Sequence, residues 1–232
     1  MTDGTPVGRR VVLGMLGAGA LGVLAGGPLS SVATRAVSAL SSHDPTGVSS
    51  LLPTGGWRIY TVTDEPTRTP ADYRLAVGGL VEKPTTLTFA DLQAMPVTRL
   101  TRDFQCVTGW RVPKVHWAGV RLADLLDAVG VQPSAKALRF TSFDGVYTES
   151  LTLDQSRRPD VLVAYGMDGG PVSHDHGGPV RMLVAPMYGY KSCKWLGGIQ
   201  LTPTVIPGYW EQYGYAVDGW VGRSNFRDDP PT

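Results

Sequence analysis

Cys106 is one of only two cysteines in this 232-residue chain, and its neighbours have the residue types of a chemical site. Gly109 and Trp110 follow it closely, and Arg111 and Lys114 come next. A thiolate in such a turn suits a soft metal ion or a nucleophilic reaction. A free cysteine is also a common buried side chain without reactivity. The segment by itself leaves both interpretations open.

Three more segments combine side chains that bind anions or metals. They are residues 141–144, residues 173–181 and residues 187–196, which carry hydroxyl, imidazole, guanidinium and ammonium groups among glycines. Arginine, lysine and serine side chains, together with backbone amides that glycine exposes, supply charge-assisted donors to a phosphate without a P-loop. These segments therefore predict a local anion site.

The histidines and cysteines in these segments leave two alternatives open. His174, His176 and Cys193 are zinc-ligand types, although their spacing matches no common finger and a catalytic zinc site needs a further carboxylate or histidine. A disulfide between Cys106 and Cys193 would abolish a metal site at Cys106. Either alternative changes the role of the cysteine.

The composition excludes several classes of function. A net charge of +1 lacks the basic surface that nucleic-acid binding needs. With 42% hydrophobic residues, the chain can bury one catalytic-sized core. No Cys-x-x-Cys pair encodes a zinc ribbon or attached haem. Residues 17–22 match Gly-x-Gly-x-x-Gly, but no strand precedes them, which argues against a dinucleotide site.

The N-terminus differs in character from the rest of the chain. Arg9 and Arg10 precede an apolar, glycine-rich run over residues 11–29, which is the layout of a twin-arginine export signal. We expect residues 1–40 to be this signal or an uncleaved membrane anchor. Residues 41–56 are rich in serine, proline and glycine and are predicted to be a linker. The globular domain is predicted over residues 57–232.

The elements that must position these groups are short. Alternation and turn residues predict strands over residues 58–62, 73–77, 100–106, 137–143, 146–151, 161–165, 180–184 and 198–201. Cap residues and helical spacing predict short helices over residues 88–95 and 122–129. Short strands with few helices favour an α+β fold with mixed β-sheets. Cys106 then lies at the end of a strand.

These motifs together resemble the molybdopterin-binding domain of the sulfite oxidase superfamily, which includes exported bacterial methionine sulfoxide reductases. The resemblance rests on the Cys106 turn, on Gly-x-Pro-Val-Arg ending at Arg181, and on Lys-Ser-x-Lys-Trp-Leu at residues 191–196, with Arg181 and Lys194 thirteen residues apart. It covers residues 57–203 and implies the sulfite oxidase-type molybdopterin-binding fold.

The resemblance also implies roles for individual residues. Cys106 corresponds to the thiolate ligand of molybdenum, and Tyr165 resembles the tyrosine beside the substrate oxygen. Arg111 is a further catalytic candidate next to the substrate. The asparagine that methionine sulfoxide reductases carry at their N-terminal cofactor contact is not evident here. The implied cofactor contacts besides Cys106 are Thr141, His176, Arg181, Ser192, Cys193, Lys194, Tyr60 and Thr61.

The implied activity is a two-electron oxygen-atom transfer on a small substrate such as sulfite or a sulfoxide. The cofactor is molybdenum with molybdopterin that carries no nucleotide. No haem, flavin or iron–sulfur motif is present, so the expected partners are a membrane or soluble cytochrome and the twin-arginine translocon. The expected location is the periplasm or the extracytoplasmic face of the membrane.

Only about thirty residues follow Pro203, so we expect a monomer whose C-terminal tail packs back on the domain. Two other classes of function stay open at this point. One is a non-catalytic extracytoplasmic binding module with the same fold. The other is a cysteine-dependent hydrolase that pairs Cys106 with His176, for which no local nucleophile signature is present.

Overall fold

The computed structural model describes residues 56–230, so the expected leader (1–40) and residues 41–55 of the expected linker lie outside the described residues. The strands are β1 (Arg74–Gly79), β2 (Thr85–Thr88), β3 (Val97–Gln105), β4 (Arg111–Arg121), β5 (Ala137–Ser142), β6 (Thr148–Thr152), β7 (Val161–Met167), β8 (Gly170–Pro171), β9 (Arg181–Val184) and β10 (Leu196–Thr202). The helices are α3 (Phe89–Ala94), α4 (Leu122–Val129) and α5 (Leu153–Ser156), with 3₁₀ turns η2 (Gly189–Lys191) and η3 (Glu211–Tyr213).

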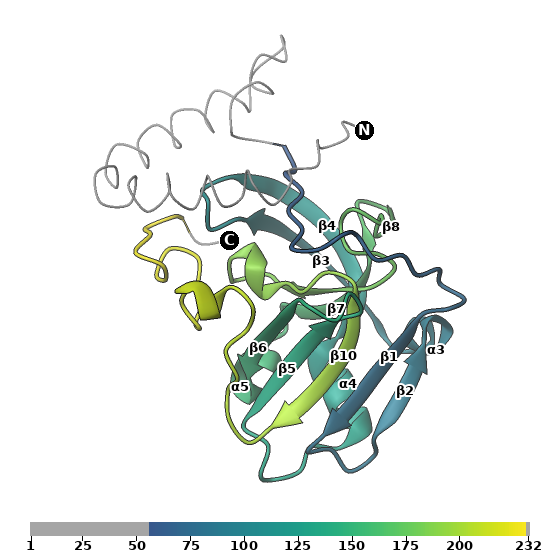
Figure 1. The fold of residues 1–232 in the computed structure, drawn as a ribbon. Coiled ribbons are helices and arrows are strands. Elements are labelled where there is room, and N and C mark those ends of the chain that lie inside the picture. The colour runs from purple at the N-terminus through teal and green to yellow at the C-terminus, as the bar shows by residue number, and fades with distance from the viewer. Residues whose placement is uncertain (1–55, 231–232) are drawn as a thin grey trace.

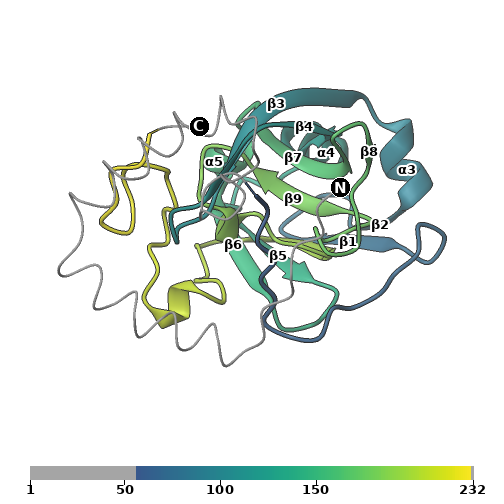
Figure 2. The same ribbon diagram turned by 90° about the horizontal axis from the view of Figure 1, so that it is seen from above.

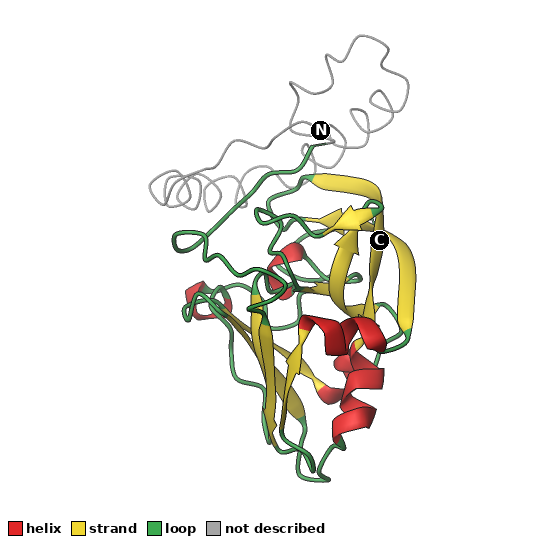
Figure 3. Cartoon of the chain, turned by 90° about the vertical axis from the view of Figure 1, so that its right-hand side faces the viewer, coloured by secondary structure: helices red, strands yellow, loops and turns green. Residues whose placement is uncertain are grey.

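The strands form two sheets, of which the first is mixed and the second is antiparallel (Figures 1 and 2). One sheet has the order β2-β1-β10-β5-β6, in which β1 and β10 run parallel and the other neighbours antiparallel. The other has the order β3-β4-β7-β8, and β9 also pairs with β7. Figure 3 shows how short the helices are beside the strands. The expected α+β fold with mixed sheets is confirmed.

The two predicted helices form where the sequence places them. Thr88 caps α3, because its side chain accepts from the amide of Asp91 and the Asp91 carboxylate accepts from the amide of Thr88. The helix α4 buries Leu122, Leu125, Leu126 and Val129, which lie on one face at helical spacing. This face packs into the core cluster that joins the two sheets.

A second core cluster packs on the other side of β3, β4 and β7, and it is rich in aromatic rings. Phe104, Trp110 and Trp117 are buried there, and Trp57 and Tyr60 pack against them. Residues 58–62 were expected to form a strand, but they run as irregular backbone with a single bridge at Tyr60. Tyr60 packs on this aromatic cluster instead of continuing a ladder.

Strand β4 was missed by the sequence patterns. It runs for eleven residues and is interrupted by a register shift against β7 between Ala118 and Gly119. A Cβ on Gly119 would lie 2.2 Å from the backbone oxygen of Val163, so only glycine allows this close approach. No helix among residues 56–230 is long and apolar enough to cross a bilayer.

Candidate cofactor site

The Cys106 thiol is presented by the tight turn between β3 and β4. The Cys106 amide donates to the backbone oxygen of Trp110 at 2.9 Å, and the Gly109 amide donates to the oxygen of Cys106 at 3.0 Å. Gly109 has φ +105°, a conformation that favours glycine. The Thr108 hydroxyl donates to Sγ of Cys106 at 3.2 Å. The turn therefore fixes a part-buried sulfur at the end of a rigid strand.

Opposing effects act on this thiol. Burial raises the pKa of Cys106, while the hydrogen bond from Thr108 and the positive charges of Arg227 and Arg58 act to lower it. Cys106 also packs against the second core cluster, which contains Trp110. The sulfur is a soft donor in an aromatic and electropositive setting, which suits a soft metal ion.

Arg181 is buried without a charged partner. It is 2% exposed, and its guanidinium donates to three backbone oxygens: Nε to Met182 at 3.2 Å, Nη1 to His176 at 2.6 Å and Nη2 to Ser192 at 3.1 Å. Its carbon lies 5.3 Å from the ring centre of Phe104. Burial lowers the pKa of Arg181 to about 10. The native fold therefore holds this cation at an energetic cost.

Two more basic side chains gather beside Arg181. Burial, with the charges of Arg181 and Lys194, lowers the pKa of His176 to about 4. Burial and then Arg181 lower the pKa of Lys194 to about 7, and its Nζ donates to the oxygen of Asp175 at 3.1 Å. A histidine with a pKa near 4 is a weak general base at neutral pH, which argues against a hydrolase that uses His176.

Carboxylates lie near the basic cluster of His176, Arg181 and Lys194, and Glu65, Asp175 and Asp144 act on Lys194 as negative charges without pairing with it. Within residues 56–230, neither Arg181 nor Lys194 forms an ion pair with a carboxylate. A buried cation is favourable only when it is paired. The cluster is therefore complete only with a bound anion, and a phosphate has the charge and the acceptor oxygens that it requires.

Aromatic rings connect the basic cluster to the cysteine turn. The ring of Trp57 lies 4.5 Å from that of His176, 5.0 Å from Phe104 and 6.1 Å from Trp110. Trp110 closes the Cys106 turn. A soft sulfur and the basic cluster thus lie at two ends of one aromatic wall. This donor set fits a molybdenum–molybdopterin group, which carries a thiolate-binding metal at one end and a phosphate at the other.

The Ser192–Cys193–Lys194 segment lines the same cluster. Ser192 accepts from Val184 through its hydroxyl at 2.9 Å and from Arg181 through its backbone oxygen. Cys193 is fully buried, and its backbone oxygen accepts from Met182 at 2.8 Å. Cys193 therefore acts through its backbone and its packing. Cys106 and Cys193 are both free thiols, so the disulfide alternative is not formed.

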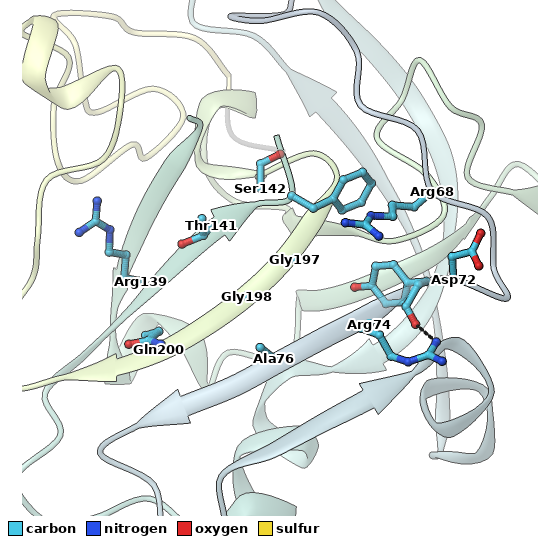
Figure 4. Close-up of a pocket in the computed structure, with 12 residues that line it drawn as sticks. Arg68, Asp72, Arg74, Ala76, Arg139, Thr141, Ser142, Gly197, Gly198 and Gln200 are labelled. Carbon is cyan, nitrogen blue, oxygen red and sulfur yellow. Dashed lines mark hydrogen bonds between the residues drawn. The ribbon is translucent and has the colours of Figure 1, made fainter. Parts of the chain in front are cut away.

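Thr141 faces away from the basic cluster. In β5 it shares a face with Arg139, and both line a pocket of about 660 Å³ on the outer face of the first sheet, together with Gly198 and Gln200 (Figure 4). Ser142, the next residue, is 1% exposed, and its oxygen accepts from the amide of Asp144 at 3.3 Å. The structure therefore does not bring Thr141 to the Arg181 cluster, and strand alternation favours Ser142 for the buried side.

Tyr165 also lies on a different side of the sheet from Cys106. Its ring packs edge-on against Phe89 at 6.0 Å, within the first core cluster. Its neighbour Ala164 faces the second cluster, where Cys106 packs. Successive residues of a strand point to opposite faces, so Tyr165 packs in a different core cluster from Cys106.

Arg111 lies next to the cysteine turn, but it is engaged. Its Nε pairs with the carboxylate of Asp103 at 2.6 Å, and its Nη1 donates to the oxygen of Pro230 at 3.1 Å. Tyr60 stacks near Trp110, with ring centres 6.4 Å apart, which places it beside the turn as expected. Thr61 follows it in a half-buried position.

The alternative zinc grouping of His174, His176 and Cys193 is not formed among the described residues, where His174 has other partners. His174 Nδ1 lies 3.3 Å from Glu65 and 3.6 Å from Asp175, and its Nε2 lies 3.2 Å from the oxygen of Pro66. This exposed group lies at the surface, while Cys193 is buried in the core.

The sequence patterns missed Trp57, Phe104, Tyr215 and Arg227 as residues of this region. Trp57 and Phe104 form the aromatic wall, and burial, followed by the negative charge of an ionised Cys106, raises the pKa of Tyr215. Side-chain alternation along β3 could have indicated Phe104 as a residue of this region, because it lies two positions before Cys106 and therefore shares its face. Nothing local marks Tyr215 or Arg227, which reach the turn from the distant tail.

Comparisons with known proteins point to one family of domains. The family described as "oxidoreductase molybdopterin binding domain" matches residues 62–210. The chain is 38% identical over 147 residues to the uncharacterized oxidoreductase YuiH of Bacillus subtilis, covering 63% of this chain and 74% of YuiH. It is 30% identical to sulfite oxidase of Arabidopsis thaliana, covering 62% of this chain and 46% of that protein.

Other relatives extend the comparison. Identity is 31% to the protein-methionine-sulfoxide reductase catalytic subunit MsrP of Ralstonia nicotianae, over 64% of this chain and 51% of MsrP. The crystal structure of the sulfane dehydrogenase SoxCD from Paracoccus pantotrophus has a TM-score of 0.56 at 25% identity, covering 61% of this chain and 41% of that chain. The matched region thus spans about half the length of the sulfite oxidase and MsrP relatives.

Proposed function

Because this chain belongs to the oxidoreductase molybdopterin-binding domain family, within the sulfite oxidase superfamily, we propose that it catalyses a two-electron oxygen-atom transfer on a small substrate. Sulfite and a sulfoxide are two of the substrate classes that its relatives' names suggest. The cofactor of this family is molybdenum bound to molybdopterin.

One observation carries the assignment of the site. Arg181 is buried against three backbone oxygens, and beside it the pKa of Lys194 is lowered to about 7. A fold can retain an uncompensated buried positive charge at a site where a bound ligand supplies the opposite charge. The phosphate of molybdopterin is an anion of the correct charge for this position.

The residues that would hold the cofactor act at its two ends. Bound molybdopterin supplies a molybdenum centre that exchanges one oxygen atom and two electrons with the substrate. Arg181, Ser192 and Lys194 would hold the phosphate, and the Cys106 thiolate would complete the metal's ligand set. Tyr60, Thr61 and His176 remain candidate contacts between them.

The chain's own side chains prepare the site in two ways. The three hydrogen bonds from Arg181 fix its guanidinium plane before an anion arrives, so little ordering is needed on binding. An anion beside Lys194 raises its pKa again, so that its Nζ keeps a proton at neutral pH. The aromatic wall around Trp57 and Phe104 supplies apolar surface between the two ends.

We propose further that the electrons pass to or from a separate cytochrome, either membrane-bound or soluble. The sequence carries no haem-attachment pair, and the printed name of MsrP describes it as a catalytic subunit. The paired arginines Arg9 and Arg10 support export through the twin-arginine translocon to the extracytoplasmic side. The catalytic unit is proposed to be a monomer.

Metal analysis of two cysteine variants tests the proposal. The full chain is produced in a host that makes molybdopterin, and its molybdenum is measured beside sulfite oxidation and methionine sulfoxide reduction. We expect about one molybdenum per wild-type chain, loss in Cys106→Ser and retention in Cys193→Ala. A metal-free wild-type protein would instead favour a non-catalytic binding module and would reject the proposed reaction.

A further inference from the structure

A third core cluster joins the C-terminal tail to both ends of the candidate cofactor site. Residues 208–230, the strap, continue beyond the family match, which ends at residue 210. In Figures 1 and 2 this yellow end of the chain lies beside the turn between β3 and β4. The cluster combines side chains of three segments: Trp210, Tyr215 and Val221 of the strap, Tyr188 and Tyr190 before the basic cluster, and Val107 beside the thiol. The strap therefore contacts the segment that leads to the basic cluster and also the cysteine turn.

The strap pairs directly with residues 186–191, which lead into the basic cluster. The amide of Tyr188 donates to the backbone oxygen of Gly219 at 2.7 Å, and Nζ of Lys191 donates to the backbone oxygen of Val217 at 2.8 Å. A Cβ on Gly219 would lie 2.6 Å from Cγ of Lys191, so only glycine allows the strap to approach this closely. The strap therefore holds this segment along its length.

Asn225 fastens the strap to the same segment with both polar atoms of its amide. Its Oδ1 accepts from the amide of Ala216 at 2.8 Å, and its Nδ2 donates to the hydroxyl of Tyr190 at 3.1 Å. That hydroxyl donates in turn to the backbone oxygen of Ala216 at 2.6 Å. Asn225 has φ +58°, a conformation that asparagine adopts more readily than most residues. One side chain thus closes a ring of three hydrogen bonds between two parts of the strap and Tyr190.

The far end of the strap reaches the cysteine turn. A Cβ on Gly109 would lie 3.1 Å from Nη2 of Arg227, and Nη1 of Arg111 donates to the backbone oxygen of Pro230 at 3.1 Å. Val107, the residue after the thiol, packs against the cluster that the strap helps to form. Displacing the strap would therefore uncover the turn that carries the thiol.

We propose that the strap is a clamp, which holds the cysteine turn and residues 186–191 in a fixed relation and restricts access to Cys106. Asn225 and Tyr190 are its positioning residues. A group bound at both ends of the site leaves only when one end moves, so a docked strap slows release of the cofactor, and the bound cofactor in turn keeps the strap docked. The effect on cofactor release rests on the proposed function. The restricted access to Cys106 does not, because it concerns only this chain's own segments.

Alkylation of Cys106 by iodoacetamide in the metal-free full chain tests the clamp. Cys193 is fully buried, so the reagent reports on Cys106. The fraction of thiolate at each pH is measured by ultraviolet absorbance, so that the rate per thiolate reports access and is independent of the thiol pKa. We expect this rate to rise about fivefold in Asn225→Gly, because glycine keeps the backbone conformation and removes both amide hydrogen bonds.

Two further variants test the same contact. Tyr190→Phe removes the hydroxyl from the other side of the ring, so it should raise the rate per thiolate as well, and the double variant should be slower than the product of the two single effects. Gln212→Ala is the matched control, because it removes an exposed amide of the strap that donates to Pro207 at 3.5 Å. Unchanged urea midpoints would show that the strap opens while the rest of the fold stays intact.

In the molybdenum-loaded chain, Asn225→Gly is expected to lose its metal on dialysis about fivefold faster than the wild type and Gln212→Ala. If the rates per thiolate in Asn225→Gly and Tyr190→Phe match that of Gln212→Ala, the clamp is rejected whatever the metal content. If these rates rise but the wild type binds no molybdenum, the proposed reaction fails and the restricted access to Cys106 stands. If they rise and the loaded variants keep their metal as long as the wild type, the role in cofactor retention is rejected.

Discussion

The Nζ of Lys191 donates to Oε1 of Glu149 at 2.6 Å, and both side chains are completely buried. The same ammonium donates to a carboxylate oxygen of Glu211 and to the backbone oxygen of Val217 at 2.8 Å. Lys191 therefore uses all three of its donors. This buried triad ties the segment that leads into Ser192 to β6 and to the C-terminal tail.

Replacing Lys191 is expected to destabilise the fold strongly. Lys191→Met leaves two buried carboxylates without their cation, and breaking a buried pair in this way costs about 3–5 kcal/mol. Urea unfolding of the variant and of the wild type measures the difference. Lys83→Met, at an exposed position, is the control and should change the free energy of unfolding by less than about 0.5 kcal/mol. Equal losses in the two variants would contradict the triad.

Arg181 should be required for cofactor retention. Arg181→Gln removes the central cation of the basic cluster, so we expect the molybdenum content of the purified chain to fall at least tenfold. Arg139→Gln removes an arginine from the outer pocket and should keep its molybdenum (Figure 4). Elemental analysis of both variants, with circular dichroism to confirm folding, makes the comparison. Full metal occupancy in a folded Arg181→Gln would place the phosphate elsewhere.

The two neighbouring hydroxyls of β5 should behave differently. Thr141 faces the outer pocket, whereas Ser142 is 1% exposed on the opposite face. We therefore expect Thr141→Val to keep its molybdenum and Ser142→Val, with a larger side chain in the buried position, to lose more than half. A loss confined to Thr141→Val would show that Thr141 contacts the cofactor, as the family resemblance implied.

Lys194 should give the cofactor-free chain a distinct dependence on pH. Burial and the charge of Arg181 lower its pKa to about 7, against 10.5 for an ordinary lysine. At pH values between these two pKa values the unfolded chain binds more protons than the folded chain, so the free energy of unfolding rises as pH rises. Below pH 7 the full cost of burying the charged ammonium is present. The slope is at most about 1.4 kcal/mol per pH unit and is reduced by solvent screening of the half-buried ammonium.

Urea unfolding at pH 8 to 10 measures this effect. The wild type is expected to gain stability relative to Lys194→Met across that range, and the difference should shrink when inorganic phosphate is present. Parallel profiles for the two proteins would show that Lys194 titrates at its ordinary pKa.

Local patterns were sufficient for part of the site. The end of a strand followed by a glycine turn placed Cys106, and the spacing of Arg181 and Lys194 placed the basic cluster. Cap residues and helical spacing predicted α3 and α4. These features depend on residues within one turn or one strand, so the sequence pattern contains the whole of the relevant information.

The rest depended on which distant segments meet. Alternate residues of β7 face different core clusters, and Tyr165 faces the first cluster while Cys106 packs against the second. The pairing of β4 with β7 contains a register shift, which residue spacing along the sequence does not reveal. Lys191 belongs to the motif at residues 191–196 that indicated the site. Its ammonium nevertheless donates to Glu149, which lies 42 residues away in the sequence.

The sequence alone thus determined the family, the thiol at a strand end and the basic residues for an anion, because each is encoded by a short run of residues. Only the tertiary structure decided that Thr141 lines the outer pocket, that Tyr165 packs on the first core cluster and that Arg227 reaches the Cys106 turn. The orientation of a side chain follows from the register and packing of whole strands, and the position of the tail follows from contacts with residues more than a hundred positions away.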